Sequence, residues 1–263
     1  MIHRNKNNKY YLKIYISKFI DLYMRLKEFE KRLQEKANPS KAKIYQRFFK
    51  TGKGEYGEGD VFLGLTMGDN RDFAKEFRDL SLENIQKLLD SKIHEKRMIG
   101  LLILVDRFKK ASKAGNEKVR KEIFRFYLSN TKNINNWDLV DVTTPHIVGD
   151  YLIDKSKSRE ILYELARSDS LWERRISVLA TFSFIRQNEF EDALRINEIL
   201  LGDKHDLMHK AVGWMLREVG KKDLSVLKEF LRENYNSLPR TTLRYAIERF
   251  EEGERKRWLR GDF

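Results

Sequence analysis

One stretch of the sequence begins with a basic residue and continues with closely spaced apolar residues: Lys210-Ala211-Val212-Gly213-Trp214-Met215-Leu216-Arg217-Glu218-Val219. Its apolar positions, together with Met208 just before it, recur every three or four residues, which is the spacing of one face of an α-helix. Trp214 falls off that stripe, one turn after Lys210 and three residues before Arg217. The stretch therefore predicts an amphipathic helix with an apolar face and a separate basic side.

The same pattern, a basic or polar start followed by apolar residues at helical spacing, recurs in residues 96–108, 174–185 and 240–250. Helix centres near residues 103, 148, 179, 214 and 245 are separated by roughly 30 to 45 residues, the period of paired-helix repeats of the HEAT type. No run shows a convincing alternating pattern of a β-strand. The sequence therefore predicts an all-α fold, an α-solenoid of HEAT-like helical repeats with a concave inner wall. An irregular helical bundle is the competing interpretation.

Helix boundaries are marked by residues that cap or break helices. Asn38-Pro39 and Thr144-Pro145 each offer an N-cap followed by proline at the first helical position. Ser170-Leu171-Trp172-Glu173 has the pattern of a capping box. Gly115 and Gly220 are predicted helix stops.

The 263 residues are expected to form one helical-repeat domain, because 41% hydrophobic residues suffice for an extended core. Its predicted parts are an N-terminal helical extension (1–24), N-terminal helices with a glycine-rich loop (25–60) and a repeat body (61–263). The extension predicts an amphipathic helix packed on its neighbour, with a membrane-surface helix as the alternative. The loop does not match a phosphate-binding motif, and Tyr56 within it is a candidate contact residue.

Lysine and arginine outnumber the acidic residues, 53 against 40, which gives a formal net charge of +13. An excess of this sign favours a polyanionic partner, nucleic acid first and an anionic membrane second. The apolar runs near the N-terminus are interrupted long before the roughly 20 residues that a membrane span needs. We therefore expect nucleic acid as the partner and no membrane.

The chain has no cysteine. This excludes disulfides, iron–sulfur clusters, thiolate zinc sites and a cysteine nucleophile, and it fits a reducing cytoplasm. His205 and His209 are one helical turn apart, but Asp206 does not match the HExxH motif and no third ligand is evident. No dinucleotide, kinase or Ser-His-Asp pattern is apparent either. We expect neither a metal nor a cofactor.

Trp137 and Asp141 are the leading candidates for chemistry. Four residues apart on a helix, they lie on one face and bring an indole beside a carboxylate. Pro145 restricts Thr144, so their helix is expected to be short and to end near residue 142 or 143. A structural alternative stays open, in which Asp138 or Asp141 complements the helix dipole and Trp137 belongs to the core.

Two adjacent arginines, Arg174 and Arg175, stand in the first turn of their predicted helix. Cations are electrostatically disfavoured at that end of a helix, so another interaction must account for them. An external anion is one explanation. An internal ion pair with Glu173 or Asp141 is equally compatible with the sequence.

The basic side formed by Lys210, Trp214 and Arg217 is a further candidate for binding. An indole flanked by cations suits stacking or sugar contact with nucleic acid. Partial burial of the indole against the next repeat explains the same pattern equally well.

Six motifs together carry a resemblance to a known family. They are Asn38-Pro39-Ser40-Lys41-Ala42, Gln46-Arg47-Phe48-Phe49-Lys50-Thr51-Gly52, Asp60-Val61-Phe62-Leu63-Gly64-Leu65, Asn136-Trp137-Asp138-Leu139-Val140-Asp141, Trp172-Glu173-Arg174-Arg175 and Lys210-Ala211-Val212-Gly213-Trp214-Met215-Leu216-Arg217-Glu218. In this order and spacing they resemble the DNA alkylation repair glycosylases, the AlkD-like family, over about residues 25–250. Asn136 departs from the pattern, since some members have a second aromatic residue there.

The resemblance implies a HEAT-like solenoid whose basic concave face holds duplex DNA with alkylated bases. It also implies a monofunctional glycosylase without metal or cofactor, which hydrolyses the N-glycosidic bond of cationic N3- or N7-alkylated purines. We expect a cytoplasmic, nucleoid-associated monomer. The alternative is a non-catalytic HEAT-like repeat module that binds DNA, RNA or a protein partner.

The resemblance also implies roles for individual residues. By position, Asp141 is similar to the family's catalytic carboxylate. Trp137 and Trp214 are similar to the aromatic residues that flank the deoxyribose of the lesion, and Arg175 is similar to the arginine that supports them. The remaining residues predicted to bind DNA are Arg174, Lys210, Arg217 and Tyr56.

Overall fold

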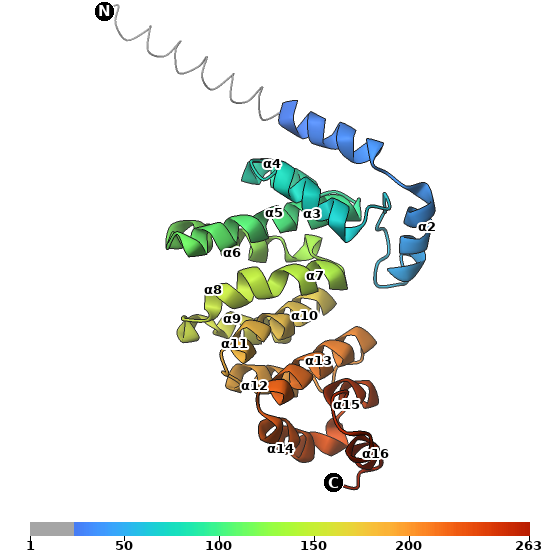
Figure 1. The fold of residues 1–263 in the computed structure, drawn as a ribbon, viewed down its shortest axis with the longest axis vertical. Helices are drawn as coiled ribbons and strands as arrows, with labels where there is room; N and C mark the ends of the chain where they lie inside the picture. The colour runs from blue at the N-terminus through green and yellow to red at the C-terminus, as the bar shows by residue number, and fades with distance from the viewer. Residues whose placement is uncertain (1–23) are drawn as a thin grey trace, which may run out of the picture. The chain divides into compact units, whose positions relative to one another are not determined.

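A computed structural model describes residues 24–263, and this part of the chain is helical without any β-strand (Figure 1). One isolated parallel bridge joins Val61 to Ile93. The all-α prediction is therefore confirmed. The helical extension predicted for residues 1–24 lies outside the described residues, apart from Met24. Among the described helices, none has the length and apolar character that crossing a membrane requires.

The chain divides into two compact units, residues 1–107 and 108–263. In the described part of the first unit, residues 24–35 form a helix. It is followed by α2 (Pro39–Phe48), α3 (Met67–Glu76), α4 (Leu82–Leu89) and α5 (His94–Lys113), the last of which continues into the second unit. The single repeat domain expected from the sequence, with a body that starts at residue 61, stays a prediction.

The second unit is a succession of mostly short helices. Its elements are, in order, α6 (Glu117–Ser129), η1 (Thr131–Asn133), α7 (Trp137–Thr144), η2 (Pro145–Gly149), α8 (Asp150–Leu152), η3 (Ser156–Ser158), α9 (Glu160–Ala166), α10 (Leu171–Ala180), α11 (Phe182–Arg186), α12 (Glu191–Ile199), α13 (Asp206–Lys222), α14 (Leu224–Asn234), η4 (Tyr235–Ser237), α15 (Arg240–Ala246) and α16 (Glu252–Arg260). The element η2 is a π-helical turn, whereas η1, η3 and η4 are 3₁₀ turns.

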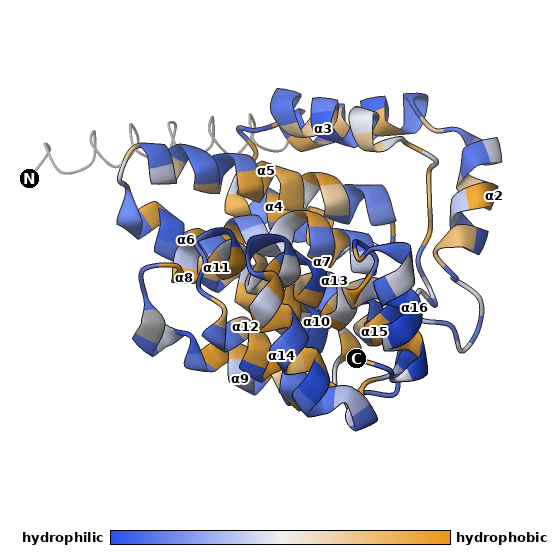
Figure 2. Cartoon of the chain, turned by 60° about the horizontal axis from the view of Figure 1, so that its bottom comes forward, coloured by the Kyte–Doolittle hydropathy of each residue, from blue (hydrophilic) through white to orange (hydrophobic). Residues whose placement is uncertain are grey.

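Helices of the second unit pack on one another in chain order. α10 packs against α7 and α13, and α13 packs in turn against α15. A second set contacts this series from α9, α12 and α14. Fully buried side chains such as Ile176 and Met215 fill the spaces between them, and Figure 2 shows the apolar residues gathered inside the helical layers. Stacking of helix pairs along the chain is the arrangement of an α-solenoid.

Asn38 and Gly115 mark helix boundaries as predicted, but the N-cap predicted at Thr144 is wrong, because Thr144 lies inside a continuous helix that runs from α7 into η2. The Asn38 side chain accepts a hydrogen bond from the Lys41 N–H at 3.0 Å, and Pro39 is the first residue of α2. Gly115, with a φ of 63°, follows the end of α5. The Ser170 side chain caps α10 by accepting from the Glu173 N–H. The Ser170 N–H, however, donates to the Ser168 hydroxyl and not to the Glu173 carboxylate, so only half of the predicted capping box forms.

The helix stop predicted at Gly220 is wrong, because α13 runs through it to Lys222. A Cβ at Gly220 would lie 2.3 Å from a methyl carbon of Leu227 on α14. The missing side chain therefore serves the close approach of two helices and not a helix end.

Candidate functional site

The helix α7 presents the Trp137-Asp141 face that the sequence singles out. It begins at Asn136, which is fully buried and extended, and whose side-chain oxygen accepts a hydrogen bond from the Trp137 N–H at 2.8 Å. Asn136 thus holds the start of the helix. Trp137 is half-buried, and Asp141 follows it one turn later on the same face.

The expected end of this helix near residue 142 or 143 is wrong. α7 continues to Thr144, and the chain then passes without a break through the π-helical turn η2 into α8. Pro145 has no N–H to donate, and the wider turn accommodates its ring without ending the helix. The carbonyl of Pro145 accepts a hydrogen bond from the Ser183 hydroxyl at 2.8 Å, which fixes the turn against α11.

Asp141 and Arg175 form a two-pronged ion pair between α7 and α10. The Arg175 Nε donates to one carboxylate oxygen at 2.7 Å, and Nη2 donates to the other at 2.8 Å. The third nitrogen, Nη1, donates to the backbone carbonyl of Leu207 near the start of α13. The Arg175 side chain is 5% exposed, whereas that of Asp141 keeps 15% of its surface open to solvent. Arg175 therefore ties α7, α10 and α13 together and holds a carboxylate at a partly open position.

The surroundings of Asp141 act on its pKa in opposite directions. Burial raises the pKa above the usual value for aspartate, the Arg175 guanidinium lowers it, and the neighbouring negative charge of Asp138 raises it again. Burial is the largest of these effects, so the pKa of Asp141 is raised overall. A carboxylate with a raised pKa is a better proton acceptor than an ordinary one.

A buried group of hydroxyls lies behind α7. The Tyr127 hydroxyl, on α6, is hydrogen-bonded to the hydroxyls of Thr143 and Thr144 at 2.9 and 2.8 Å. All three residues are fully buried, and burial raises the pKa of Tyr127 to about 12. Sequence reasoning missed this anchor. A Thr-Thr pair ahead of proline was its only trace in the sequence, and the partner on α6 depends on tertiary packing.

Trp214 lies on α13, two helical turns beyond Leu207 and so about 10 Å farther along that helix. Its ring is half-buried, with its centre 6.2 Å from that of Phe182, and its Nε1 donates to Glu218 at 3.0 Å. The structure thus links Trp214 to the Asp141–Arg175 pair through α13, and the indole donates its hydrogen bond to Glu218 and not to the pair. Phe182 was not identified from the sequence.

Gly213, next to Trp214, sets how closely α13 approaches α15. A Cβ at this position would lie 2.5 Å from the Cβ of Tyr245 and 2.6 Å from the carbonyl oxygen of Thr242. We expect Gly213→Ala to lower the free energy of unfolding by about 1–3 kcal/mol, since α15 must shift to make room. Urea denaturation measures this.

Gly253→Ala is the matched control, because a Cβ at Gly253 in α16 would meet open space. There the better helix propensity of alanine should stabilise the protein by up to about 1 kcal/mol. Equal unfolding midpoints for the two variants would contradict the close packing at Gly213.

The other predicted DNA-binding residues all have acidic or backbone partners. Arg174 donates to Asp203 at 2.6 Å and to two carbonyls of the preceding loop. Lys210 pairs with Asp206 at 2.7 Å, and Arg217 pairs with Glu248. In the first unit, the Tyr56 hydroxyl donates to the carbonyl of Phe48 at 3.4 Å. Their roles toward DNA stay predictions.

The two histidines have structural roles. His205 caps α13, and its Nδ1 accepts a hydrogen bond from the Leu207 N–H at 3.2 Å. His209 is hydrogen-bonded through Nε2 to the carbonyl of Asp203. The described residues contain no group of three potential metal ligands.

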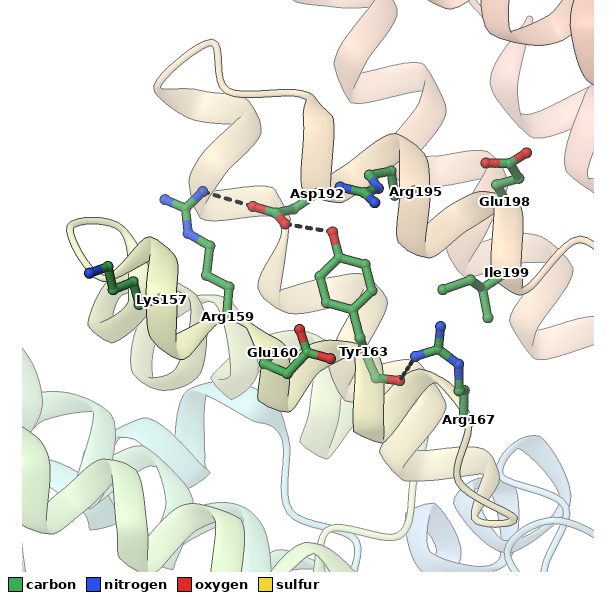
Figure 3. A pocket seen from close by; sticks show the side chains of 9 residues that line it. All are labelled: Lys157, Arg159, Glu160, Tyr163, Arg167, Asp192, Arg195, Glu198 and Ile199. Carbon is green, nitrogen blue, oxygen red and sulfur yellow. Dashed lines mark hydrogen bonds and ion pairs between the residues drawn. The ribbon is translucent and has the colours of Figure 1, made fainter.

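A polar cavity of about 550 Å³ lies elsewhere in the second unit, between α9 and α12 (Figure 3). Asp192 on α12 lines this cavity and accepts hydrogen bonds from Arg159 at 2.8 Å and from the Tyr163 hydroxyl at 2.7 Å. Both cations and carboxylates line its wall. None of the residues predicted for the site lines this cavity, and its ion pairs hold the two helices together.

Two comparisons with known proteins give a match, one to a family model and one to a solved structure. The family model described as DNA alkylation repair enzyme matches residues 29–250. A solved structure of a "predicted DNA alkylation repair enzyme from Enterococcus faecalis" is similar to this chain with a TM-score of 0.62 at 14% sequence identity, covering 82% of this chain and 97% of that one. No curated protein gives a match. At that identity the structural likeness shows a common fold.

Proposed function

The chain belongs to the DNA alkylation repair enzyme family, and on this basis we propose that it is a monofunctional DNA glycosylase for N3- and N7-alkylated purines in duplex DNA. The family makes DNA the substrate. The observation that carries the glycosylase chemistry is the ion pair between Asp141 and Arg175, which holds a carboxylate at a partly open position on α7.

The reaction needs little more than such a carboxylate. A purine alkylated at N3 or N7 carries a positive charge and leaves as a neutral base, so it requires little help from a general acid. The sugar left behind resembles an oxocarbenium ion, which a negative charge stabilises. Asp141 supplies that charge.

Arg175 fixes the carboxylate without using up its hydrogen-bonding capacity. An ionised carboxylate has about four lone-pair sites, and Arg175 occupies two of them. The remaining sites can orient a water molecule for attack on the sugar and accept its proton, which the raised pKa of Asp141 favours.

The aromatic residues add to this stabilisation in the proposal. Trp137, one turn before Asp141, offers an indole face to the positively charged sugar. Trp214 provides a second indole from α13. The net charge of +13 suits attraction of DNA to a basic concave face. Action as a cytoplasmic, nucleoid-associated monomer belongs to the same proposal.

The direct test is incubation of the wild-type protein with duplex DNA that contains N7-methylguanine. We expect abasic sites to form, which alkaline strand cleavage reveals on a denaturing gel. A protein that binds the duplex but leaves no abasic site, across a range of salt and temperature, would instead be a non-catalytic repeat module.

The raised pKa of Asp141 predicts how base release depends on pH. The ionised carboxylate is the active form, so the single-turnover rate should fall as the pH falls through this raised pKa, above the usual value of about 3.9 for aspartate. Asp138→Asn removes the neighbouring negative charge, and an asparagine oxygen can still accept from the Leu139 N–H. This variant should therefore shift the acid limb to lower pH. If the acid limbs of the pH–rate profiles of the wild type and Asp138→Asn coincided, Asp141 would not be the titrating group.

A further inference from the structure

The helix α2 in the first unit carries cations that have no acidic partner in the part of the chain that the structure describes. Residues 36–54 contain six lysines and arginines and neither aspartate nor glutamate. Lys36 pairs with Asp69. The other five are exposed, and none of them forms an ion pair with any residue from 24 to 263: Lys41, Lys43, Arg47, Lys50 and Lys53. Elsewhere in the described chain, each of the predicted DNA-binding cations forms an ion pair with a carboxylate.

The two carboxylates that follow this helix first in the sequence are hydrogen-bonded within their own loop. Glu55 accepts a hydrogen bond from the Gly52 N–H at 2.8 Å, and Glu58 accepts one from the Gly54 N–H at 2.8 Å. They are thus engaged with backbone groups. Within residues 24–263, no carboxylate forms an ion pair with the cations of α2.

Two large apolar side chains are exposed on the same helix. Ile44 is 53% exposed and Phe48 is 62% exposed, and they lie one turn apart on one face. At 3.6 residues per turn, Lys41 lies on one side of this pair, and Lys43 and Arg47 lie on the other. The outward half of α2 is therefore an apolar ridge between two cationic edges.

This ridge is held rigidly, because the opposite face of α2 is anchored. Phe49, directly after the helix, stacks on Phe62 with 4.9 Å between the ring centres. Tyr45 packs edge-on against Phe62, with 6.0 Å between the ring centres. At the start of the helix, the Asn38 N–H donates to the carbonyl of Leu63 at 2.7 Å. A Cβ at Gly64, which has a φ of 87°, would lie 2.2 Å from the carbonyl oxygen of Asn38, so this contact requires glycine. Ile44 and Phe48 are thus exposed although the helix that carries them is packed against its neighbours through its opposite face.

We propose that the outward face of α2 binds nucleic acid, with Lys41, Lys43 and Arg47 on phosphates and the ridge of Ile44 and Phe48 against sugars and base edges in a groove. Cations beside an exposed apolar side chain match the alternation of phosphate and sugar in a nucleic acid strand. A helix that lies on a membrane presents a broad apolar face, whereas α2 exposes two apolar side chains. Charge complementarity and the DNA substrate of the family favour the duplex over a lipid surface.

The test measures affinity for a short, unmodified, fluorescein-labelled duplex by anisotropy at several salt concentrations. Lys43→Gln/Arg47→Gln should weaken binding at least about tenfold at low salt and reduce the slope of log Kd against log salt by about 2. Ile44→Ala/Phe48→Ala should weaken binding at least about fivefold with an unchanged slope. Because the duplex carries no lesion, the result is independent of whether the protein releases bases.

Arg195→Gln/Lys256→Gln is the matched control. It removes the same charge from two exposed cations that pair with Glu191 and Glu252 on their own helices. We expect duplex affinity within about twofold of wild type for the control, since paired cations gain little from phosphate contact.

Three results would overturn the proposal. One is wild-type affinity and salt slope in both α2 variants. Another is a loss in the control as large as that in Lys43→Gln/Arg47→Gln, which would mean that only net charge matters. The third is unchanged duplex affinity of Ile44→Ala/Phe48→Ala together with a different defect of this variant. A lower melting temperature would assign the ridge to internal packing. Loss of binding to phosphatidylglycerol vesicles would assign it to a lipid surface.

Discussion

Asp141→Asn should reduce base release from N7-methylguanine DNA at least about a hundredfold. Asparagine keeps the shape of the side chain and an oxygen that accepts from Arg175, but it carries no negative charge for the sugar and cannot take a proton from water. Affinity for the same duplex should stay within about threefold of wild type, because a neutral side chain repels phosphate less than a carboxylate does. Single-turnover kinetics and anisotropy binding measure the two quantities separately.

Asp192→Asn is the matched control for this result. Asp192 is also a partly buried carboxylate in an arginine ion pair, but it lies in the cavity between α9 and α12. We expect this variant to release base at close to the wild-type rate. If Asp141→Asn lowered the melting temperature markedly while turnover stayed within a few-fold of wild type, Asp141 would be structural and the proposed chemistry would be wrong.

Arg175→Met should be the most destabilising substitution at the site. It leaves the Asp141 carboxylate without its ion-pair partner and removes one donor from the Leu207 carbonyl, and breaking a buried pair costs about 3–5 kcal/mol. The pKa of Asp141 should then rise further in the folded protein. Since the folded state binds the proton more tightly than the unfolded state, stability should be regained as the pH falls through this raised pKa. Urea denaturation at neutral and acidic pH measures both effects.

A double variant separates the ion pair from packing. Asp141→Asn/Arg175→Met has no buried charge left, so its loss of unfolding free energy should shrink to about 1 kcal/mol or less. A double variant as unstable as Arg175→Met alone would show that the arginine acts through its hydrocarbon stem and the Leu207 contact, not through Asp141.

The all-helical fold could be predicted from the sequence because it rests on local signals. The apolar period of residues 210–219 and the capping at Asn38 depend on neighbours within a few positions. Gly220 shows the limit of such signals. A glycine that ends a helix and a glycine that admits Leu227 from another helix look the same in one sequence.

The site was predictable only in part, for a similar reason. The spacing of Trp137 and Asp141 placed both on one helical face, which the structure shows. For Arg175, an external anion and two internal partners stayed open, because the choice depends on how α7 packs on α10. The environment of Trp214 likewise depends on Phe182 and Glu218, whose contacts follow from packing and rotamer choice.

The central claim is that the protein breaks the bond between the sugar and an intact alkylated base. It is tested most directly by mass spectrometry of the products after a single turnover on a duplex with one N7-methylguanine. We expect free N7-methylguanine in solution together with a strand that contains one abasic site. A strand that keeps its methylated base, or one restored to guanine with no base set free, would contradict the claim.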